Sequence, residues 1–151
     1  MLRLVLDTNV LLDCWVFDDP RARPLWRAVE RQAVQCLRSN ATDDELAEVL
    51  ARPAFAARRA ALGLYVDALM RRWQALAQPV ERVFAAPWHC TDPQDQKFLD
   101  LAATARADLL VSKDKALLKV NGRALRSGLS IVGVAGAAVR LAAAGVVAAA
   151  A

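Results

Sequence analysis

The fold is decided by the stretch Leu2-Arg3-Leu4-Val5-Leu6-Asp7-Thr8-Asn9-Val10, in which a short apolar run stops abruptly at a carboxylate. An apolar helical stretch, Val10-Leu11-Leu12, follows at once, so the pattern predicts a strand and then a short helix over about residues 8–16. In a parallel α/β sheet, functional crevices lie beyond the carboxyl ends of the strands. Asp7 is therefore a candidate functional residue, with helix capping by Asp7 or Thr8 as the structural alternative.

Strand and helix patterns alternate along the rest of the chain. Short apolar runs predict further strands at residues 34–38, 107–112 and 130–134, and a strand or extended segment at 80–84. Helical spacing predicts helices at residues 23–32, 42–52 and 55–77 (the last broken near Gly63), others that begin near Asp92 and Leu117, and an Ala-rich helix over about 135–151. This alternation predicts an α/β fold with right-handed crossovers and a parallel sheet.

The length and composition favour one globular domain that covers residues 1–151. Hydrophobic residues make up 56% of the 151 residues, which argues against intrinsic disorder. The net charge of +4 is compatible with a polyanionic partner, although many ordinary proteins share such an excess of base.

Cysteine and histidine usage argues against several classes of site. Cys14, Cys36 and Cys90 are odd in number and form no C-x-x-C pair, which argues against a disulfide framework or a thiolate zinc site and fits a reducing cytoplasm. His89 is the only histidine and no G-x-S-x-G is present, so triad chemistry is disfavoured. We expect no signal peptide and no membrane contact, because the apolar tail carries Arg140 and falls short of the roughly 20 residues of a membrane span.

Three further acids occur in settings like that of Asp7. Asp114 follows the strand predicted at residues 107–112, and Glu45 and Asp95 lie near helix N-termini that face the same edge of the sheet. Carboxylates gathered in this way repel one another and become tolerable when a hard divalent cation such as Mg²⁺ or Mn²⁺ binds them. The basic residues beyond the acids would then receive phosphates, with a solvated face as the alternative.

These acids also have structural explanations. Thr42-Asp43-Asp44-Glu45 matches a capping box, in which Thr42 caps the helix and Glu45 reaches back to it. Asp92-Pro93-Gln94-Asp95 matches a helix start, in which Asp92 is the N-cap and both acids interact favourably with the helix dipole.

Four stretches, taken together, resemble the PIN-domain family, and most of all its branch described as toxin components of bacterial toxin–antitoxin systems. They are Leu6-Asp7-Thr8-Asn9-Val10, Asp44-Glu45-Leu46-Ala47-Glu48-Val49-Leu50-Ala51-Arg52-Pro53, Asp92-Pro93-Gln94-Asp95-Gln96-Lys97-Phe98-Leu99 and Ser112-Lys113-Asp114-Lys115-Ala116-Leu117-Leu118. The resemblance runs in order from residue 2 to about residue 134.

The resemblance implies a three-layer α/β/α sandwich with a central parallel sheet of about five strands. It also implies Mg²⁺- or Mn²⁺-dependent ribonuclease activity that leaves a 5′-phosphate and a 3′-hydroxyl. By motif position, the catalytic metal ligands would be Asp7, Glu45, Asp95 and Asp114, with Asp92 as an additional ligand and Asn9 and Ser112 supporting the metal shell. RNA, a cognate antitoxin protein and a homodimeric assembly are the partners that the resemblance suggests.

Two positions depart from the pattern of this branch. Lys113 stands where the branch often has glycine, and Ala116 stands where it often has aspartate. Neither change removes one of the acids, and Lys113 becomes a candidate RNA contact together with Lys115 and Lys119.

The leading hypothesis is a metal-dependent endoribonuclease that serves as the toxin component of a toxin–antitoxin system. A non-catalytic PIN-like module that binds RNA or protein is the alternative, motivated by the basic clusters and by Lys113. A third hypothesis is phosphoryl transfer with Asp7 as nucleophile; Asn9 argues against it, since haloacid-dehalogenase-like enzymes usually have a second aspartate there.

Overall fold

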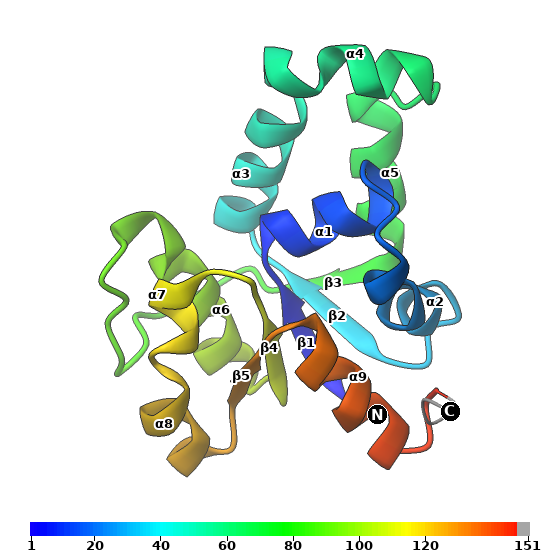
Figure 1. Cartoon of the computed structure of the whole chain (residues 1–151). Coiled ribbons are helices and arrows are strands. Elements are labelled where there is room, and N and C mark those ends of the chain that lie inside the picture. The colour runs from blue at the N-terminus through cyan, green and yellow to red at the C-terminus, as the bar shows by residue number, and fades with distance from the viewer. Residues whose placement is uncertain (148–151) are drawn as a thin grey trace.

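A parallel sheet forms the centre of the molecule in the computed structural model, which describes residues 1–147 (Figure 1). Within those residues, five strands lie in the order β3-β2-β1-β4-β5, and every neighbouring pair is parallel. Their bounds are β1 (Arg3–Leu6), β2 (Gln35–Arg38), β3 (Ala77–Pro79), β4 (Leu109–Val111) and β5 (Ser130–Val132). The α/β class and the five-stranded parallel sheet expected from the sequence are confirmed.

Helices connect the strands and cover both faces of the sheet. They are α1 (Thr8–Trp15), α2 (Arg23–Glu30), α3 (Asn40–Leu50), α4 (Pro53–Ala61), α5 (Val66–Leu76), α6 (Gln96–Ala105), α7 (Lys115–Leu118), α8 (Asn121–Ala124) and α9 (Val134–Ala143). Single 3₁₀ turns occur at η1 (Pro20–Ala22), η2 (Pro93–Asp95) and η3 (Leu125–Ser127). The helical region predicted at residues 55–77 is indeed two helices, which separate near Gly63.

Alternating strand residues supply two separate cores, because successive side chains of a strand point to opposite faces. Leu4 and Leu6 of β1 pack in one core with side chains of α1, α2, α3, α5 and α9. Val5, between them, packs in the other core with side chains of α6, α7 and α8. This arrangement is the three-layer α/β/α sandwich that the family resemblance implies, and Figure 1 shows the two helical layers on either side of the sheet.

Helices α3, α4 and α5 form an arm that projects from the sheet, at the top of Figure 1. The inner end of the arm is anchored, because Leu46 and Leu50 of α3 and Leu69 and Trp73 of α5 are buried in the first core. The outer helix, α4, contains no buried residue. The arm therefore presents a largely exposed helix above the carboxyl ends of the strands.

Of the two alternatives expected at residues 80–84, a strand or an extended segment, the strand does not form. The third strand is β3, whose Ala77 pairs with Cys36 of β2, and the ladder ends when the Val80 N–H donates to the Arg38 carbonyl at 2.8 Å. The chain then leaves the sheet and follows α6, where the Phe84 N–H donates to the Thr104 hydroxyl at 2.9 Å. The apolar pattern is misleading because Val83 and Phe84 are exposed.

The predicted capping box at Thr42 and Glu45 is also wrong. Helix α3 begins three residues earlier, where Ser39 is the N-cap and its hydroxyl accepts the Thr42 N–H at 3.2 Å. Thr42 takes the reciprocal position and accepts the Ser39 N–H through Oγ1 at 2.9 Å. Glu45 is thus in the second turn of the helix and is free of any capping role.

The Ala-rich helix expected over about residues 135–151 is shorter than predicted. Helix α9 ends at Ala143, and Gly145 follows in the left-handed region with φ of 74°. Residues 148–151 of the expected helix lie outside the described part of the chain. Among the described residues, no helix has the length and apolar character needed to cross a membrane.

Candidate functional site

Asp7 lies at the carboxyl end of β1 and begins α1. Its Oδ1 accepts the Val10 N–H at 2.9 Å, and its Oδ2 accepts the Ser112 hydroxyl in a short hydrogen bond. Asp7 is 4% exposed, so these two bonds fix its carboxylate in a buried position. Asp7 is therefore a helix cap and, at the same time, a carboxylate at the edge of the sheet.

Asp114 lies beyond the neighbouring strand, β4, and begins α7. Its Oδ1 accepts the Ala116 N–H at 2.8 Å, and its own N–H donates to Ser112 Oγ at 2.9 Å. Ser112 is fully buried and so links Asp7 and Asp114 through one hydroxyl. Ser112, which the resemblance places in support of the metal shell, thus contacts both of these residues.

Glu45 reaches the same edge from α3. Its Oε2 accepts the Thr8 hydroxyl at 2.5 Å, and its Oε1 pairs with Lys97 Nζ at 2.8 Å. The sequence reasoning missed Lys97, although it lies two residues after Asp95 in the same motif. The Glu45 carboxylate is therefore already neutralised by a cation that the chain itself supplies.

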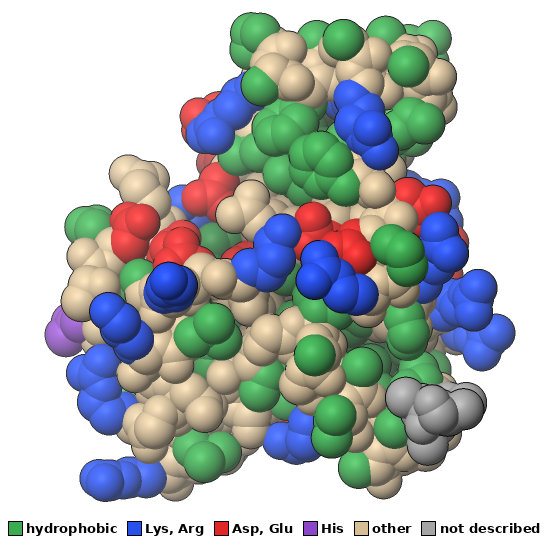
Figure 2. Space-filling model, in the orientation of Figure 1, with side chains coloured by type: hydrophobic (Ala, Val, Ile, Leu, Met, Phe, Trp, Pro, Cys, Tyr) green, Lys and Arg blue, Asp and Glu red, His purple; other side chains and the backbone are tan. Residues whose placement is uncertain are grey.

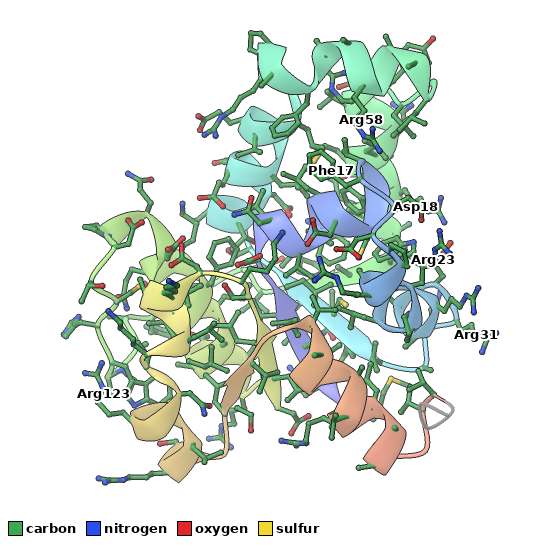
Figure 3. All side chains as sticks on the ribbon, in the orientation of Figure 1. Phe17, Asp18, Arg23, Arg31, Arg58 and Arg123 are labelled. Atoms are coloured by element: carbon green, nitrogen blue, oxygen red, sulfur yellow. The ribbon has the colours of Figure 1, made fainter. Side chains whose placement is uncertain are left out.

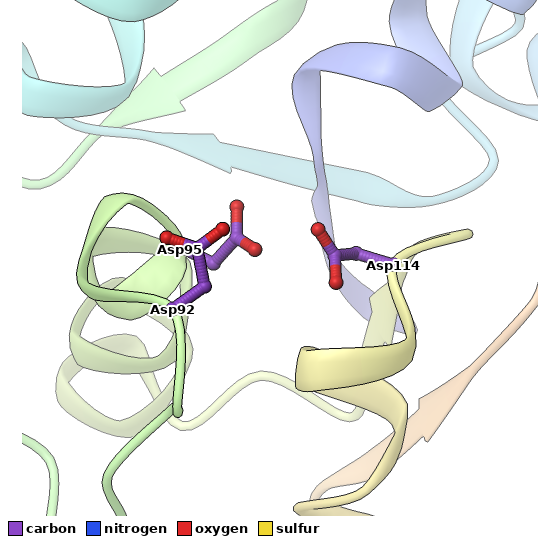
Figure 4. A group of neighbouring side chains, drawn as sticks. All are labelled: Asp92, Asp95 and Asp114. Carbon is purple, nitrogen blue, oxygen red and sulfur yellow. The ribbon is translucent and has the colours of Figure 1, made fainter.

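Asp92, Asp95 and Asp114 form the tightest acidic group. Each offers one carboxylate oxygen such that these atoms lie within 4.8 Å of one another. Figure 4 shows Asp92 and Asp95 at the start of α6 and Asp114 at the start of α7, facing each other. Asp92 also caps η2, because its Oδ1 accepts the Gln94 N–H at 2.9 Å. The predicted N-cap role of Asp92 is thus confirmed.

A single cleft of about 180 Å³ joins four of the five predicted acids, and Asp92 does not line it. Asp7, Glu45, Asp95 and Asp114 all line it, and so do Thr8, Asn9, Val49, Arg52, Phe55 and Phe98. Figure 2 shows acidic side chains gathered across the middle of the molecule, below the arm, with basic side chains directly beside them.

The three lysines predicted to contact RNA do not line the cleft. Lys113, Lys115 and Lys119 are exposed on and around α7. Lys113 Nζ pairs at 2.7 Å with Oδ2 of Asp13, a buried acid near the end of α1. Lys113 therefore links the loop before Asp114 to α1 through this ion pair. The sequence did not predict the pair.

Burial and mutual repulsion oppose the ionisation of two carboxyl groups in the site. Burial raises the pKa of Asp7 above its ordinary value, and the charge of Asp114 adds to this effect, while the bonds from Ser112 and Val10 oppose it. The pKa of Asp95 is raised to about 7, first by burial and then by the carboxylate of Asp114 and the charges of Asp92 and Asp7. Two of the acids therefore hold protons more tightly than ordinary carboxyl groups do.

The donor set fits a hard divalent cation. All of the clustered donors are carboxylate oxygens, which are the ligands that Mg²⁺ and Mn²⁺ prefer. Asp95 Oδ2 is buried without a hydrogen-bond partner among residues 1–147, so it is a desolvated oxygen that a cation would satisfy. The raised pKa values point the same way, since a bound cation would offset both the burial of these carboxylates and the repulsion between them.

Comparison with known proteins supports this assignment. A family model described as PIN domain matches residues 3–116, a span that contains Asp7, Glu45, Asp92, Asp95 and Asp114. No curated protein matches the chain. The match extends over most of the chain, from β1 to the start of α7. The chain therefore belongs to the PIN-domain family, whose members are generally metal-dependent nucleases.

Proposed function

We propose that the protein is an endoribonuclease that hydrolyses RNA phosphodiester bonds and depends on Mg²⁺ or Mn²⁺. The observation that carries this proposal is the single cleft lined by Asp7, Glu45, Asp95 and Asp114 in a chain of the PIN-domain family. These acids come from four separate segments, and two of them, Glu45 and Asp95, make no capping hydrogen bond that would explain their position.

The acids would divide the work between them. Asp92, Asp95 and Asp114, with Asp7 beside them, would hold the cation, which when bound activates water and neutralises charge on the phosphodiester. Ser112 fixes the Asp7 carboxylate and the backbone of Asp114 through one hydroxyl, and the Ala116 N–H fixes the Asp114 carboxylate, so neither carboxylate must reorganise when substrate arrives. Glu45 is held by Thr8 and Lys97 at the other side of the cleft.

Basic residues outside the cleft would contact the rest of the RNA. Lys115 and Lys119 are exposed near Asp114 in the sequence and have the charge to bind phosphates. Lys113 is half exposed and paired with Asp13, so its main effect would be to position the loop that carries Asp114. Asn9 lines the cleft and would support the metal shell as the resemblance implies.

The biological role is proposed from the motif resemblance. The four motif stretches favour a toxin component of a bacterial toxin–antitoxin system, with a cognate antitoxin protein, a cytoplasmic location and a homodimeric assembly as further parts of the proposal. Induced expression should arrest bacterial growth, and the arrest should disappear in Asp7→Asn.

Purified protein should cleave single-stranded RNA when Mn²⁺ or Mg²⁺ is present and should stop when EDTA removes the cation. Asp7→Asn should reduce the cleavage rate to background, because it removes a charge from the centre of the cleft while an amide oxygen can still accept the Ser112 hydroxyl. Asp67→Asn is the matched control, since Asp67 is an exposed acid on α5. Undiminished cleavage by Asp7→Asn would reject the proposal.

A non-catalytic binding module is the second candidate, and the Lys97–Glu45 ion pair favours it. That pair supplies an internal cation at a position where a metal ligand is expected. A titration with MnCl₂ separates the two candidates, because a pure binding module should show no Mn²⁺ site that depends on Asp95 or Asp114.

A further inference from the structure

The cleft that contains the acids has a second wall, which comes from the junction between α3 and α4. Val49, Arg52 and Phe55 contribute to it, and the same cleft is lined by Asp95 and Asp114. A cation and an aromatic ring therefore lie beside the carboxylates, within the same hollow. The acidic mechanism proposed above makes no use of either side chain.

Phe55 is held in place without being fully buried. Its ring meets the Phe17 ring edge-on at a centroid distance of 5.9 Å and an interplanar angle of 70°. Phe17 is itself 43% exposed and carries the Arg58 guanidinium over its ring, 5.4 Å from the centroid. Arg58 is in turn tied to the Val16 carbonyl, to which its Nε donates at 2.6 Å. Figure 3 shows Phe17 and Arg58 together at the inner side of the arm.

Core packing accounts for only part of this arrangement. Phe55 touches the first core, yet the helix that carries it, α4, has no buried residue. A partly exposed ring that packs against a neighbouring aromatic ring, itself covered by a guanidinium, is a ready platform for a flat ligand. The face of such a ring can stack a nucleobase at little entropic cost, since the ring is already immobilised.

Arg52 supplies positive charge at the same wall. Its side chain is 54% exposed and pairs only loosely with Glu48, at 3.4 Å and one helical turn away. Exposed pairs of this kind contribute little, so the guanidinium is available to a stronger anionic partner. A phosphate is such a partner, because it accepts two parallel hydrogen bonds from a guanidinium.

We infer that Phe55 and Arg52 form a nucleotide subsite of the cleft, in which Phe55 stacks a base of single-stranded RNA and Arg52 binds an adjacent phosphate. The inference rests on the proposed function and extends it, because it assigns the substrate contacts to the arm. Single-stranded nucleic acids are bound elsewhere by this combination of aromatic stacking and basic side chains. An RNA duplex would keep its bases stacked internally and could not use the platform.

Binding can be measured without cleavage, by fluorescence polarisation in EDTA, with two probes of equal length. One is a short oligouridine RNA, and the other is the same ribose-phosphate chain without bases. Phe55→Leu should weaken oligouridine binding about tenfold and leave the abasic probe unaffected. Arg52→Gln should weaken both probes and reduce the slope of log K against log salt by about 0.7, the value for one phosphate contact on a single strand.

Matched variants control for general effects. Phe84→Leu removes an aromatic ring that is 67% exposed and lines no part of this cleft, and Arg31→Gln removes an exposed charge at the end of α2 that does not line the cleft either (Figure 3). Neither should change the affinity for oligouridine by more than about twofold. Phe55→Tyr keeps the ring and should retain the affinity, and thermal unfolding of each variant reports whether the arm stays folded.

The outcomes are distinct from those of the cleavage test. The stacking contact is overturned if Phe55→Leu loses equal affinity for both probes, or if it is folded and loses none. The phosphate contact is overturned if the salt slope of Arg52→Gln is unchanged. If the wild type cleaves RNA while both variants bind like it, the subsite is wrong and the nuclease assignment stands. If the variants behave as expected but no cation supports cleavage, the subsite stands and the nuclease assignment fails.

Discussion

At the scale of single residues, the acids of the candidate site serve structure and site together. Asp7, Asp92 and Asp114 each cap a helical turn, through bonds from the N–H groups of Val10, Gln94 and Ala116. A capping bond gives each carboxylate a defined direction, and the positive end of a helix dipole lowers the cost of its charge. The capping and functional interpretations of these sequences are therefore compatible, and the caps help to hold mutually repelling charges at one edge of the sheet.

The raised pKa of Asp95 predicts a loss of stability with rising pH in the metal-free protein. Its folded pKa of about 7 exceeds the unfolded value of about 3.9, so the folded state binds the proton more tightly. Stability should therefore fall as pH rises from about 4 to about 7 and should stay level above that range. Asp95→Asn should flatten this fall, as measured by the melting temperature in EDTA at several pH values.

The exposed acid Asp67 provides the control for this titration. Asp67→Asn should leave the pH dependence of the melting temperature as it is in the wild type, because Asp67 lies on α5, away from the cleft. If Asp95→Asn follows the same curve as the wild type, the raised pKa of Asp95 is not the source of the pH dependence.

Removal of the Lys97 charge should strengthen the binding of Mn²⁺ by the acids of the cleft. Lys97→Met removes the cation that pairs with Glu45 at 2.8 Å and leaves the carboxylate in place. A unit charge at such a distance, screened by water, is worth on the order of 1 kcal/mol, so the affinity for Mn²⁺ should rise several-fold. Calorimetric titration with MnCl₂ tests this, with the exposed Lys119→Met as control. An affinity that falls or stays constant would show that Lys97 does not compete with the cation.

At the scale of single elements, the start of α3 sets the position of Glu45. Ser39→Ala removes the N-cap hydroxyl that accepts the Thr42 N–H at 3.2 Å, and loss of such a cap costs about 1 kcal/mol of stability. Urea unfolding should show this decrease, whereas Asn40→Ala, at the exposed first helical position, should be close to neutral. Equal stability of Ser39→Ala and the wild type would mean that α3 begins elsewhere.

The same helix shows how far the sequence could predict the structure. Ser39 and Thr42 form a capping box that overlaps the expected one at Thr42 and Glu45, and both satisfy the local pattern. The end of β2 at Arg38 decides between them, because the chain must turn into the helix directly after the strand. The expected placement of Asp7 and Asp114 at one edge agrees with the structure, since it depends only on parallel strands that sequence patterns reveal.

Contacts between distant segments were beyond the reach of sequence patterns. The Lys97–Glu45 pair joins residues 52 positions apart, and the Lys113–Asp13 pair joins a loop to α1. Strand β3 is found at Ala77–Pro79 because Ala77 pairs with Cys36, not because its residues are especially apolar. Such features follow from tertiary packing, which overrides local propensity.

At the scale of the whole molecule, the candidate site lies where the two helical layers meet. The helices that carry Asp7 and Glu45, α1 and α3, belong to the core on one face of the sheet, and α6 and α7 belong to the core on the other face. The carboxylates of Asp95 and Asp114 therefore approach those of the first layer only across the edge of the sheet. The charges of Asp7 and Asp114 repel each other across this junction, and a cation bound by both would link the layers.

Binding of Mn²⁺ should therefore stabilise the entire fold. At a free concentration of about 100 times the dissociation constant, a ligand that binds only the folded state adds ~2.7 kcal/mol of stability. For a chain of this length, that gain corresponds to a rise in melting temperature of roughly 5–10 °C. Differential scanning fluorimetry with MnCl₂ and with EDTA measures it, and the rise should shrink in Asp95→Asn and persist in Asp67→Asn. If Mn²⁺ leaves the melting temperature of the wild type unchanged, the acids of the two layers do not share a cation.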